Sequence, residues 1–483
     1  MDAVATLWAE AGLPAEVLPW LEIEGEDPVL PSSFALGRAA ASAIGAAGLA
    51  AALLWRERGG HAQRVRVALQ DAALECRSEQ LLRVGGEPPP APWDAIAGLY
   101  PTADGWARIH TNFPHHRDGF LDLLGCSYDR GAVAETLRSW PALAFEDASA
   151  ARGLPAAAYC SLSEWDAHPQ ARAIAGLPLV ELASVSDAAP EALPPSPRPL
   201  SGVRVLDLSR IIAGPVAGRT LAAHGADVLA ISGPHLPSIE SAVIDTGRGK
   251  LTAALDLRTP AGRTQLEQLI RAADVFIQAY RPGALAALGF GLDHLTRLRP
   301  GLVCVSLSAW SRNGPWAGRR GFDSLAQTAT GLNSAEAQAA GQSTPRPLPA
   351  QVLDHATGHL MAFGAMAGLH RRATRGGSSH IQLSLARTAL WLRAFGRVEG
   401  GFAIPDPGQH SYLEPSQSGF GPLLAAPHAA RLDATPARYG RPAMPLGSHA
   451  ALWPPRPGCV ARTSRTTACS AASKPGPVPD TMP

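Results

Sequence analysis

The chain is poor in cysteine and carries almost no excess charge. Its 483 residues include only six cysteines, and none of these has the C-x-x-C spacing of a structural zinc or redox site. Scattered thiols also argue against a disulfide framework, so we expect reduced cysteines in a cytoplasmic protein. Lysine and arginine (42) nearly balance aspartate and glutamate (41), which leaves no global field to attract nucleic acid or an anionic membrane. We therefore predict neither kind of partner.

Signals for export, membrane insertion and dinucleotide binding are also missing. The first segment, MDAVATLWAEAGLPAE, lacks the basic and then apolar pattern of a secretory signal. Residues 39–55 are uncharged and nearly long enough to span a bilayer, but they are rich in Ala and Gly, so a tightly packed buried helix is predicted. No G-x-G-x-x-G follows a predicted strand, which argues against a nicotinamide-dependent dehydrogenase.

Metal-ligand spacing is absent as well. His110, His115 and His116 lie close together, but no carboxylate or cysteine completes a recognisable ligand set around them. We interpret them as polar residues of a turn and predict no metal site.

The strongest positive pattern is an internal repeat. Residues 38–74 align without a gap with residues 354–390, and both copies read as a long small-residue helix, a glycine turn, a short strand and another helix. The shared positions include Gly48/Gly364, Arg56/Arg372, Gly60/Gly376, Leu69/Leu385 and Leu74/Leu390. The copies differ at their first residue, which is Arg38 in one and Asp354 in the other. Chemistry that needs a carboxylate there is possible in only one copy.

Composition divides the chain into five segments. We predict a partial large-domain repeat unit over 1–90 and a small α+β domain over 91–187. Residues 188–202 are Pro-rich and typical of a stiff linker. Over 203–400 apolar strands alternate with helices, which predicts a doubly wound, Rossmann-like parallel sheet and an α/β fold class. Residues 401–483 lose periodicity, and we predict an irregular, largely disordered tail.

Several separated motifs in the second half resemble one family. They are PLSGVRVLDLSRIIAGPVAGRTLAAHGADV, GRGKLTAALDL, ADVFIQAYRPGALAALGF, RPGLVCVSLSAWSRNGP and GFDSLAQTATGL. In order and spacing, residues 199–400 resemble the class III CoA-transferases, the CaiB/BaiF family. Residues 37–180, with GLYPTADGWARIHTNFPHHRDGFLDLLG, resemble the later part of the same family. The chain thus resembles a tandem or permuted member, with carboxy-terminal material placed first.

The resemblance implies a mechanism centred on Asp354. The family nucleophile is an aspartate before a small-residue helix, here Asp354 of LDHATGHL, with Gly358 expected to open the helix. Its carboxylate would attack an acyl-CoA thioester, take up CoA as an aspartyl-CoA thioester and pass it to a second carboxylic acid. Without the family context, an aspartate before a helix is more often an N-cap. The resemblance also implies that Asp323 is a second acid near the site.

An isomerase is a weaker alternative. Racemases of the same superfamily carry a histidine directly before the second acid, and this histidine transfers a proton. The corresponding residue here is Phe322, which cannot exchange a proton. An α-methylacyl-CoA racemase-like activity is therefore disfavoured.

For CoA binding, the resemblance implies a path along the turn after the first strand of the second half. The implied residues are Ile211, Ile212, Ala213, Arg248, Lys250 and Tyr280. Arg248 and Lys250 fit a solvated turn equally well, since surface charges need no function. Family positions that are usually charged or asparagine are small or apolar at 231–233, 279 and 287, which predicts altered CoA binding.

We therefore predict a CoA-transferase that uses an acyl-CoA and a carboxylic acid, with coenzyme A as co-substrate and no permanently bound cofactor. The family's interlocked dimers imply a homodimer, or a permuted chain that completes both halves within itself. The alternative from another class is a non-catalytic CoA-binding or scaffolding relative, motivated by the missing basic contacts and the irregular tail. The acyl donor and acceptor depend on loops that the sequence does not place.

Overall fold

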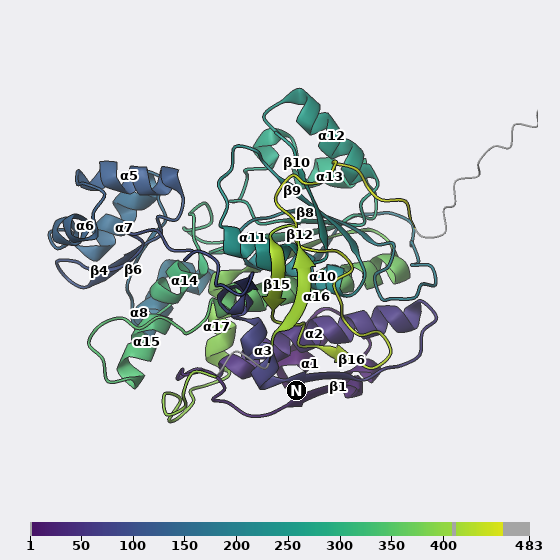
Figure 1. Cartoon of the computed structure of the whole chain (residues 1–483), viewed down its shortest axis with the longest axis horizontal. Coiled ribbons are helices and arrows are strands. Elements are labelled where there is room, and N and C mark those ends of the chain that lie inside the picture. The colour runs from purple at the N-terminus through teal and green to yellow at the C-terminus, as the bar shows by residue number, and fades with distance from the viewer. Residues whose placement is uncertain (1, 408–411, 457–483) are drawn as a thin grey trace, which may run out of the picture. The chain divides into compact units, whose positions relative to one another are not determined.

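The computed structural model describes residues 2–407 and 412–456. Contacts divide the chain after Trp453, and every element named below lies in the first unit, Met1–Trp453 (Figure 1). The predicted division of this span into separate domains stays a prediction.

A seven-stranded sheet organises the second half. Its strands are β7 (Glu181–Ser186), β8 (Arg204–Leu208), β9 (Asp227–Ser232), β10 (Lys250–Ala254), β11 (Val275–Gln278), β12 (Val303–Ser308) and β13 (Ser378–Ser384). They are ordered β10-β9-β8-β11-β12-β13-β7, and all pairs are parallel except β13 with β7. From β8 onward this is the 3-2-1-4-5-6 order of a doubly wound sheet, so the predicted α/β class is confirmed. The order reverses between β8 and β11, where a crevice opens at the carboxyl ends of the strands.

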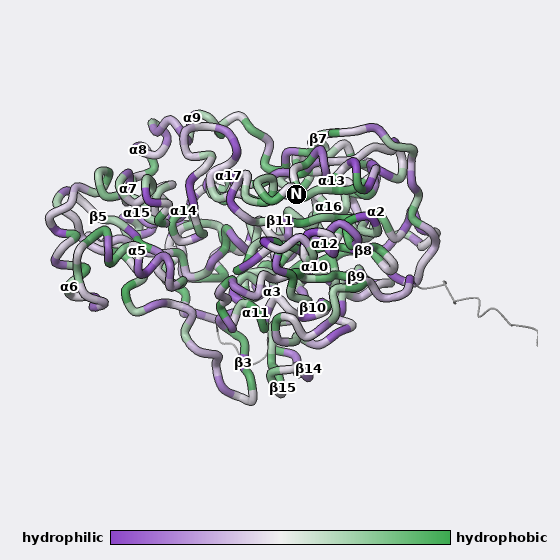
Figure 2. Tube along the Cα trace, turned by 90° about the horizontal axis from the view of Figure 1, so that it is seen from above, coloured by the Kyte–Doolittle hydropathy of each residue, from purple (hydrophilic) through white to green (hydrophobic). Residues whose placement is uncertain are grey.

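Helices cover both faces of this sheet because alternate strand residues point to opposite sides. They are α10 (Ala213–Ala223), α11 (Glu240–Gly247), α12 (Pro260–Arg271), η2 (Ala286–Leu288), α13 (Leu292–Leu298), α16 (Val352–Arg375) and α17 (Leu385–Ala394). The helices α14 (Asp323–Ala329) and α15 (Leu332–Ala339) pack against each other beside the sheet's helices. Val275 belongs to the apolar cluster that includes α10 and α16, whereas its neighbour Phe276 belongs to the cluster with α12 and α13. The trace is accordingly hydrophobic around α10 and β9 (Figure 2).

The repeat exists as structure. The first copy folds as α2 (Leu36–Glu57), β2 (Val65–Ala68) and α3 (Leu69–Glu75), which correspond to α16, β13 and α17. A side chain at Gly48 would lie 2.9 Å from Val65 of β2, and one at Gly364 would lie 2.6 Å from Ile381 of β13. The shared glycines therefore let the long helix of each copy lie directly on its strand. The match extends to the strand before, since β1 (Leu21–Glu24) pairs parallel with β2 as β12 does with β13.

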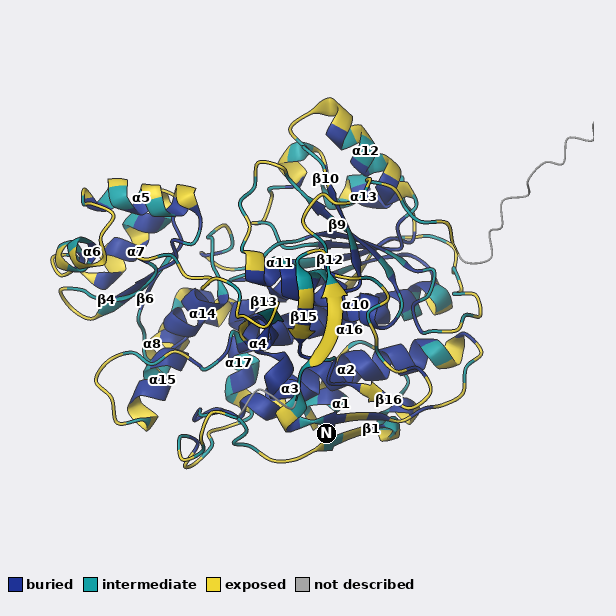
Figure 3. Cartoon of the chain, viewed as in Figure 1, coloured by how far each residue is buried: buried dark blue, intermediate teal, exposed yellow. Residues whose placement is uncertain are grey.

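The helix α2 is long and apolar enough to cross a membrane by length and composition. It packs against α16, and 94% of its apolar window is buried within the structure. Both helices are buried along most of their length in Figure 3. The prediction of a buried helix over 39–55 is confirmed.

The region after the first copy forms a small α+β layer with its own core. It contains the hairpin of β4 (Gly98–Pro101) and β5 (Trp106–Ile109), to which β6 (Ala156–Ala158) is added. Its helices are α5 (Pro114–Leu124), α6 (Arg130–Leu137), α7 (Ala142–Ala151), α8 (Leu162–Ala167) and α9 (Pro169–Ile174). Apolar residues such as Ile96, Phe120 and Phe145 form a core between the hairpin and α5, α6 and α7, whereas Trp165 of α8 and Ile174 of α9 belong to the large apolar cluster.

The structure differs from the sequence prediction at two segment boundaries. β7 falls in the predicted small domain but forms the antiparallel edge of the large sheet. The Pro-rich linker is held against the first copy, because Arg58 donates hydrogen bonds to the carbonyls of Pro194, Pro199 and Ser201.

The prediction of an irregular tail is wrong for its described part. β14 (Glu414–Ser418), β15 (Gly421–Ala425) and β16 (Arg431–Leu432) form there; β15 pairs with β3 (Arg83–Val84) and β16 with β2. These strands are too short to produce a recognisable alternation in the sequence. The disorder predicted for 457–483 and 408–411 falls outside the described residues. The remaining elements are α1 (Asp2–Glu10), η1 (Ala15–Trp20) and α4 (Ser78–Leu81).

Candidate active site

Asp354 lies in the first turn of α16, at the meeting point of two cavities. The helix begins at Val352, so the expectation that Gly358 opens it is wrong. Gly358 instead lets α10 approach, because a side chain there would lie 2.5 Å from the carbonyl oxygen of Ala213. This contact brings the first residues of α10 close to the start of α16.

Asp323, the first residue of α14, caps α16. Its Oδ2 accepts a hydrogen bond from the backbone N–H of Asp354 at 2.9 Å, and its Oδ1 accepts from Gln327 at 2.5 Å. Asp354 is therefore not the N-cap of its own helix. No described residue donates a hydrogen bond to the Asp354 carboxylate, which leaves both of its oxygens free for chemistry.

Both acids have raised pKa values. Burial raises the pKa of Asp354 well above its ordinary value, and the charges of Asp323 and Glu79 raise it further. Burial also raises the pKa of Asp323, although the N–H of Asp354 and the amide of Gln327 oppose this. The site thus holds a carboxylate of unusual basicity next to one that is stabilised by hydrogen bonds.

One cavity, of about 230 Å³, is called here the proline-walled cavity. Its wall includes Pro88, Pro89, Pro90, Pro92, Trp93, Glu79, Gln80, His110, Ile211, Ile239, Phe322, Asp323 and Asp354. The ring of His110 stacks on Phe322 at a centroid distance of 3.7 Å. Glu79 bonds His355 Nε2 at 2.8 Å, so a residue from the first half of the chain pairs with the neighbour of Asp354. The Pro-rich break thus forms a wall of the site.

The other cavity, of about 330 Å³, is called here the arginine cavity. Four arginines line it: Arg210, Arg281, Arg319 and Arg320. The guanidinium of Arg319 is paired with Glu146 and Asp147. The predicted residues Ile211, Ile212, Ala213 and Tyr280 line it too, so the structure brings them together with Asp354. His115 and His116 also belong to its wall.

Sequence reasoning missed Glu79, His110 and these four arginines. The arginines lie on loops that look like ordinary charged surface in the sequence. The only available signal for one of them was its position, since Arg210 directly precedes the predicted turn at Ile211.

Ile211 lines both cavities and has a strained backbone. Its φ of 74° lies in the left-handed region, which is rare for a β-branched residue. Such a conformation costs on the order of 1–3 kcal/mol and is maintained only where the surroundings require it. The turn after β8 is therefore shaped by the site.

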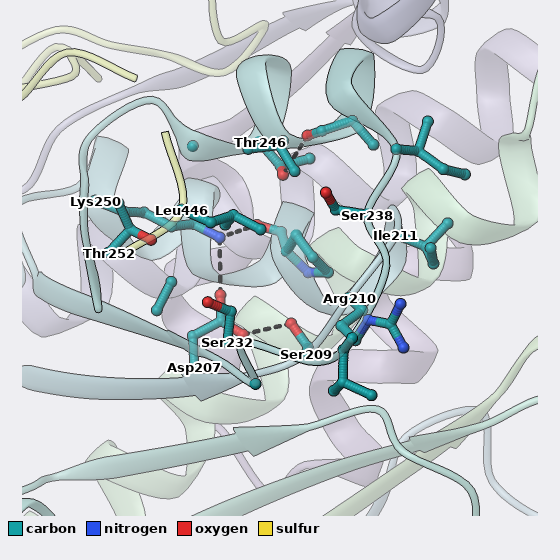
Figure 4. Close-up of a pocket in the computed structure, with 18 of the residues that line it drawn as sticks. Asp207, Ser209, Arg210, Ile211, Ser232, Ser238, Thr246, Lys250, Thr252 and Leu446 are labelled. Atoms are coloured by element: carbon teal, nitrogen blue, oxygen red, sulfur yellow. Dashed lines mark hydrogen bonds and ion pairs between the residues drawn. The ribbon is translucent and has the colours of Figure 1, made fainter. Parts of the chain in front are cut away.

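Lys250 and Arg248 are placed differently from the prediction, and both are buried, which excludes a solvated turn. Lys250 Nζ bonds Asp207 at 2.8 Å and the carbonyl of Pro215 at 2.7 Å, beside a third, smaller cavity (Figure 4). Arg248 bonds Asp245 and the carbonyl of Ala426. Neither side chain lines a cavity that contains Asp354.

One group of side chains has the composition of a metal site: Glu75, His359 and His428, whose ligand atoms lie within 4.8 Å of one another. Glu75 is already engaged, since it bonds His428 at 2.9 Å and accepts from the N–H of Ala429 at 2.7 Å. The Arg219 guanidinium lies 3.7 Å from Glu75, and its positive charge opposes a cation there. This group also lines neither cavity at Asp354, so we interpret it as a structural network.

Known proteins resemble this chain in sequence. The model of CoA-transferase family III matches residues 5–178 and 200–417. An acyl-CoA transferase of Gibberella moniliformis is 33% identical over 317 residues, which are 59% of this chain and 54% of that protein. A probable fatty acyl-CoA transferase of Mycobacterium tuberculosis is 31% identical over 210 residues, 41% of this chain and 53% of that protein.

A solved structure, that of a CAIB/BAIF family protein from Brucella suis, is 25% identical with a TM-score of 0.37, and covers 47% of this chain and 65% of that one. The chain spans about half the length of the two curated relatives named above.

Proposed function

The chain belongs to CoA-transferase family III, and on this premise we propose that it moves CoA from an acyl-CoA to a carboxylic acid with Asp354 as the nucleophile. The alternative of a racemase-like isomerase has less support. His110 reaches the wall next to Phe322, but burial and the nearby Arg108 lower the pKa of His110 to about 3, which makes it a weak base.

The main support for this proposal is the position of Asp354 between two cavities of different character. The arginine cavity presents Arg210, Arg281 and Arg320, together with the first residue of α10. Guanidinium groups and helix N-termini both suit phosphate, so this side fits the charged part of CoA. The proline-walled cavity is smaller and mostly apolar, as an acyl group requires. A thioester that joins the two would present its carbonyl to Asp354.

The proposed reaction needs no external co-reactant. A carboxylate oxygen of Asp354 attacks the thioester carbon, the C–S bond breaks, and CoA leaves as thiolate while a mixed anhydride forms. The thiolate then attacks the aspartyl carbonyl, which releases the donor as a free carboxylate and leaves an aspartyl-CoA thioester. An acceptor carboxylate repeats these steps in reverse and regenerates Asp354. No net proton is gained or lost.

The neighbouring residues support this role for Asp354. Its raised pKa means a more basic and hence more nucleophilic carboxylate once it is ionised. Asp323 takes the capping position, so Asp354 is not bound to its own helix end. The N-terminus of α16 offers a positive dipole to the negative charge that develops on the carbonyl oxygen.

The test is incubation of the full chain with a panel of acyl-CoAs, followed by intact mass and hydroxylamine trapping. We expect a CoA adduct, and conversion of Asp354 to a hydroxamate in the peptide that contains it. Asp354→Asn should lose both signals, whereas the matched variant in the other repeat, Arg38→Ala, should keep them. Absence of any adduct across the panel would favour the scaffolding alternative.

The site draws on both halves of one chain, since Glu79 belongs to the first half and Asp354 to the second. We propose on this ground that a single chain contains one complete site, whether or not two chains associate as the family resemblance implies. This proposal can be tested by comparing the molar mass of the protein in solution with the number of CoA adducts per chain. A cytoplasmic location stays a prediction.

A further inference from the structure

We propose that the acyl group this chain carries is an uncharged, short monocarboxylic chain, and that acyl groups with a second carboxylate are poor substrates. This rests on the proposed function, because it places the acyl group in the proline-walled cavity. The charge of the cavity wall then defines the class of acyl group.

The wall of the proline-walled cavity consists of His110 and of acidic, apolar and neutral polar residues, the last being Gln80, Asn112, Ser241, Ser324 and Gln351. Glu79, Asp323 and Asp354 all line it, and no Lys or Arg occurs among its described lining residues. A second carboxylate on the acyl chain would lose its water and gain no cationic partner there. It would also stand close to Asp323 and Glu79, whose charges already raise the pKa of Asp354.

Two basic residues at the end of the strand beside this wall, His110 and Arg108, do not supply a cation to it. His110 is buried, and the lowered pKa described above leaves its imidazole neutral at pH 7. The Arg108 guanidinium stacks on the ring of Trp93, 5.4 Å from its centroid, and does not line the cavity. Trp93 does line it, so the cavity presents an indole ring to the ligand at this point.

The size of the cavity limits the length of the chain. At roughly 30 Å³ for each water-sized group, a volume of about 230 Å³ holds about seven or eight non-hydrogen atoms. Pro88, Trp93, Ile239 and Phe322 supply the apolar contacts that such a group needs. A short aliphatic or small aromatic acyl group meets both conditions.

The proposal can be tested by measuring how tightly acyl-CoAs bind to a chain that cannot turn them over. The Asp354→Asn chain is titrated with acyl-CoAs paired by carbon number: butyryl against succinyl, and valeryl against glutaryl. We expect the uncharged member of each pair to bind at least about tenfold more tightly, and to load the wild-type chain faster by a similar factor. Equal or tighter binding of the dicarboxylic members would overturn the proposal.

A substitution that adds a cation to the cavity wall tests whether charge causes the preference for uncharged acyl groups. Gln80 lines the cavity with an exposed side chain, so Gln80→Arg adds a cation at small structural cost. This variant should reduce the preference for the uncharged member several-fold, whereas Gln80→Met, similar in size and uncharged, should not. An equal effect of both variants would refute the charge argument.

The two levels of the proposal fail in different ways. Rapid loading of Asp354 by succinyl-CoA or glutaryl-CoA would contradict only the acyl class. Loading by no acyl-CoA at all would contradict the proposed function, and the acyl class with it.

Discussion

The backbone N–H of Arg38 donates a hydrogen bond to Asp27 Oδ2 at 2.9 Å. The second repeat has the same arrangement, in which the N–H of Asp354 donates to Asp323 Oδ2 at 2.9 Å. Each long helix is thus capped by an aspartate from an earlier segment. The capping acid exists in both copies and the free carboxylate in one, so capping and chemistry are separate roles.

Arg38→Ala should leave CoA transfer unchanged, because Arg38 is exposed and lines neither cavity at Asp354. The measurement is the rate of CoA exchange between a donor thioester and an acid acceptor. A large loss of rate with an unchanged melting temperature would show that the first copy takes part in the reaction.

Asp27→Ala should destabilise the fold by about 1–2 kcal/mol, the usual cost of losing a helix cap. The N–H groups of Gly37 and Arg38 would lose their acceptor in a half-buried site. Urea unfolding measures this change. The rate of transfer by the folded fraction should stay at the wild-type value; a drop there would mean that α2 positions the site.

Asp323→Asn should shift the acid limb of the transfer rate to lower pH. The Asp323 charge contributes to the raised pKa of Asp354, so its removal lets Asp354 ionise more readily. The amide oxygen of asparagine still accepts from the N–H of Asp354, which keeps the cap. A pH–rate profile of both chains is the measurement, and an unshifted acid limb would refute the coupling.

The features that could be predicted from the sequence are local ones, in which the residues concerned lie near one another in the chain. The strands of the second half appear at the predicted places, as in β8 and β12, because parallel strands buried on both faces are continuous apolar runs. The repeat was visible because it preserves contacts such as Gly48 with Val65 and Gly364 with Ile381. Asp354 and Asp323, by contrast, came from the family resemblance.

The missed residues carry no local signal. Glu79 meets His355 across 276 positions of the chain, and His110 meets Phe322 only through the packing of the small α+β layer against α14. For Lys250 the family resemblance implied a contact with CoA, and the sequence did not reveal that its side chain pairs with Asp207 in the interior. Tertiary contacts of this kind do not follow from periodicity or composition.

Lys250→Met should act on stability more than on CoA affinity. The substitution leaves Asp207 buried without its cation, and breaking a buried ion pair in this way costs about 3–5 kcal/mol. Thermal unfolding should therefore show a clear loss, while the KM for acyl-CoA of the folded fraction should change little. A raised KM with wild-type stability would instead restore the predicted contact between Lys250 and CoA.

Asp354→Asn should abolish transfer and yet stabilise the fold at neutral pH. The raised pKa means that the folded state binds a proton at Asp354 more tightly than the unfolded state does, so stability falls as pH rises from the unfolded pKa through the folded one. Each tenfold difference in proton affinity between the two states corresponds to about 1.4 kcal/mol, so we expect a gain in the free energy of unfolding that urea titration detects at pH 7.

This gain should shrink as the pH approaches about 4, where the aspartate is protonated in both states. Unfolding of both chains at pH 7 and pH 4 is the measurement, with Arg38→Ala as the substitution at the equivalent position of the first repeat. If Asp354→Asn instead lowers the free energy of unfolding at pH 7, the ionised carboxylate stabilises the fold. The idea that the wild-type chain loses stability by keeping this carboxylate for catalysis would then be wrong.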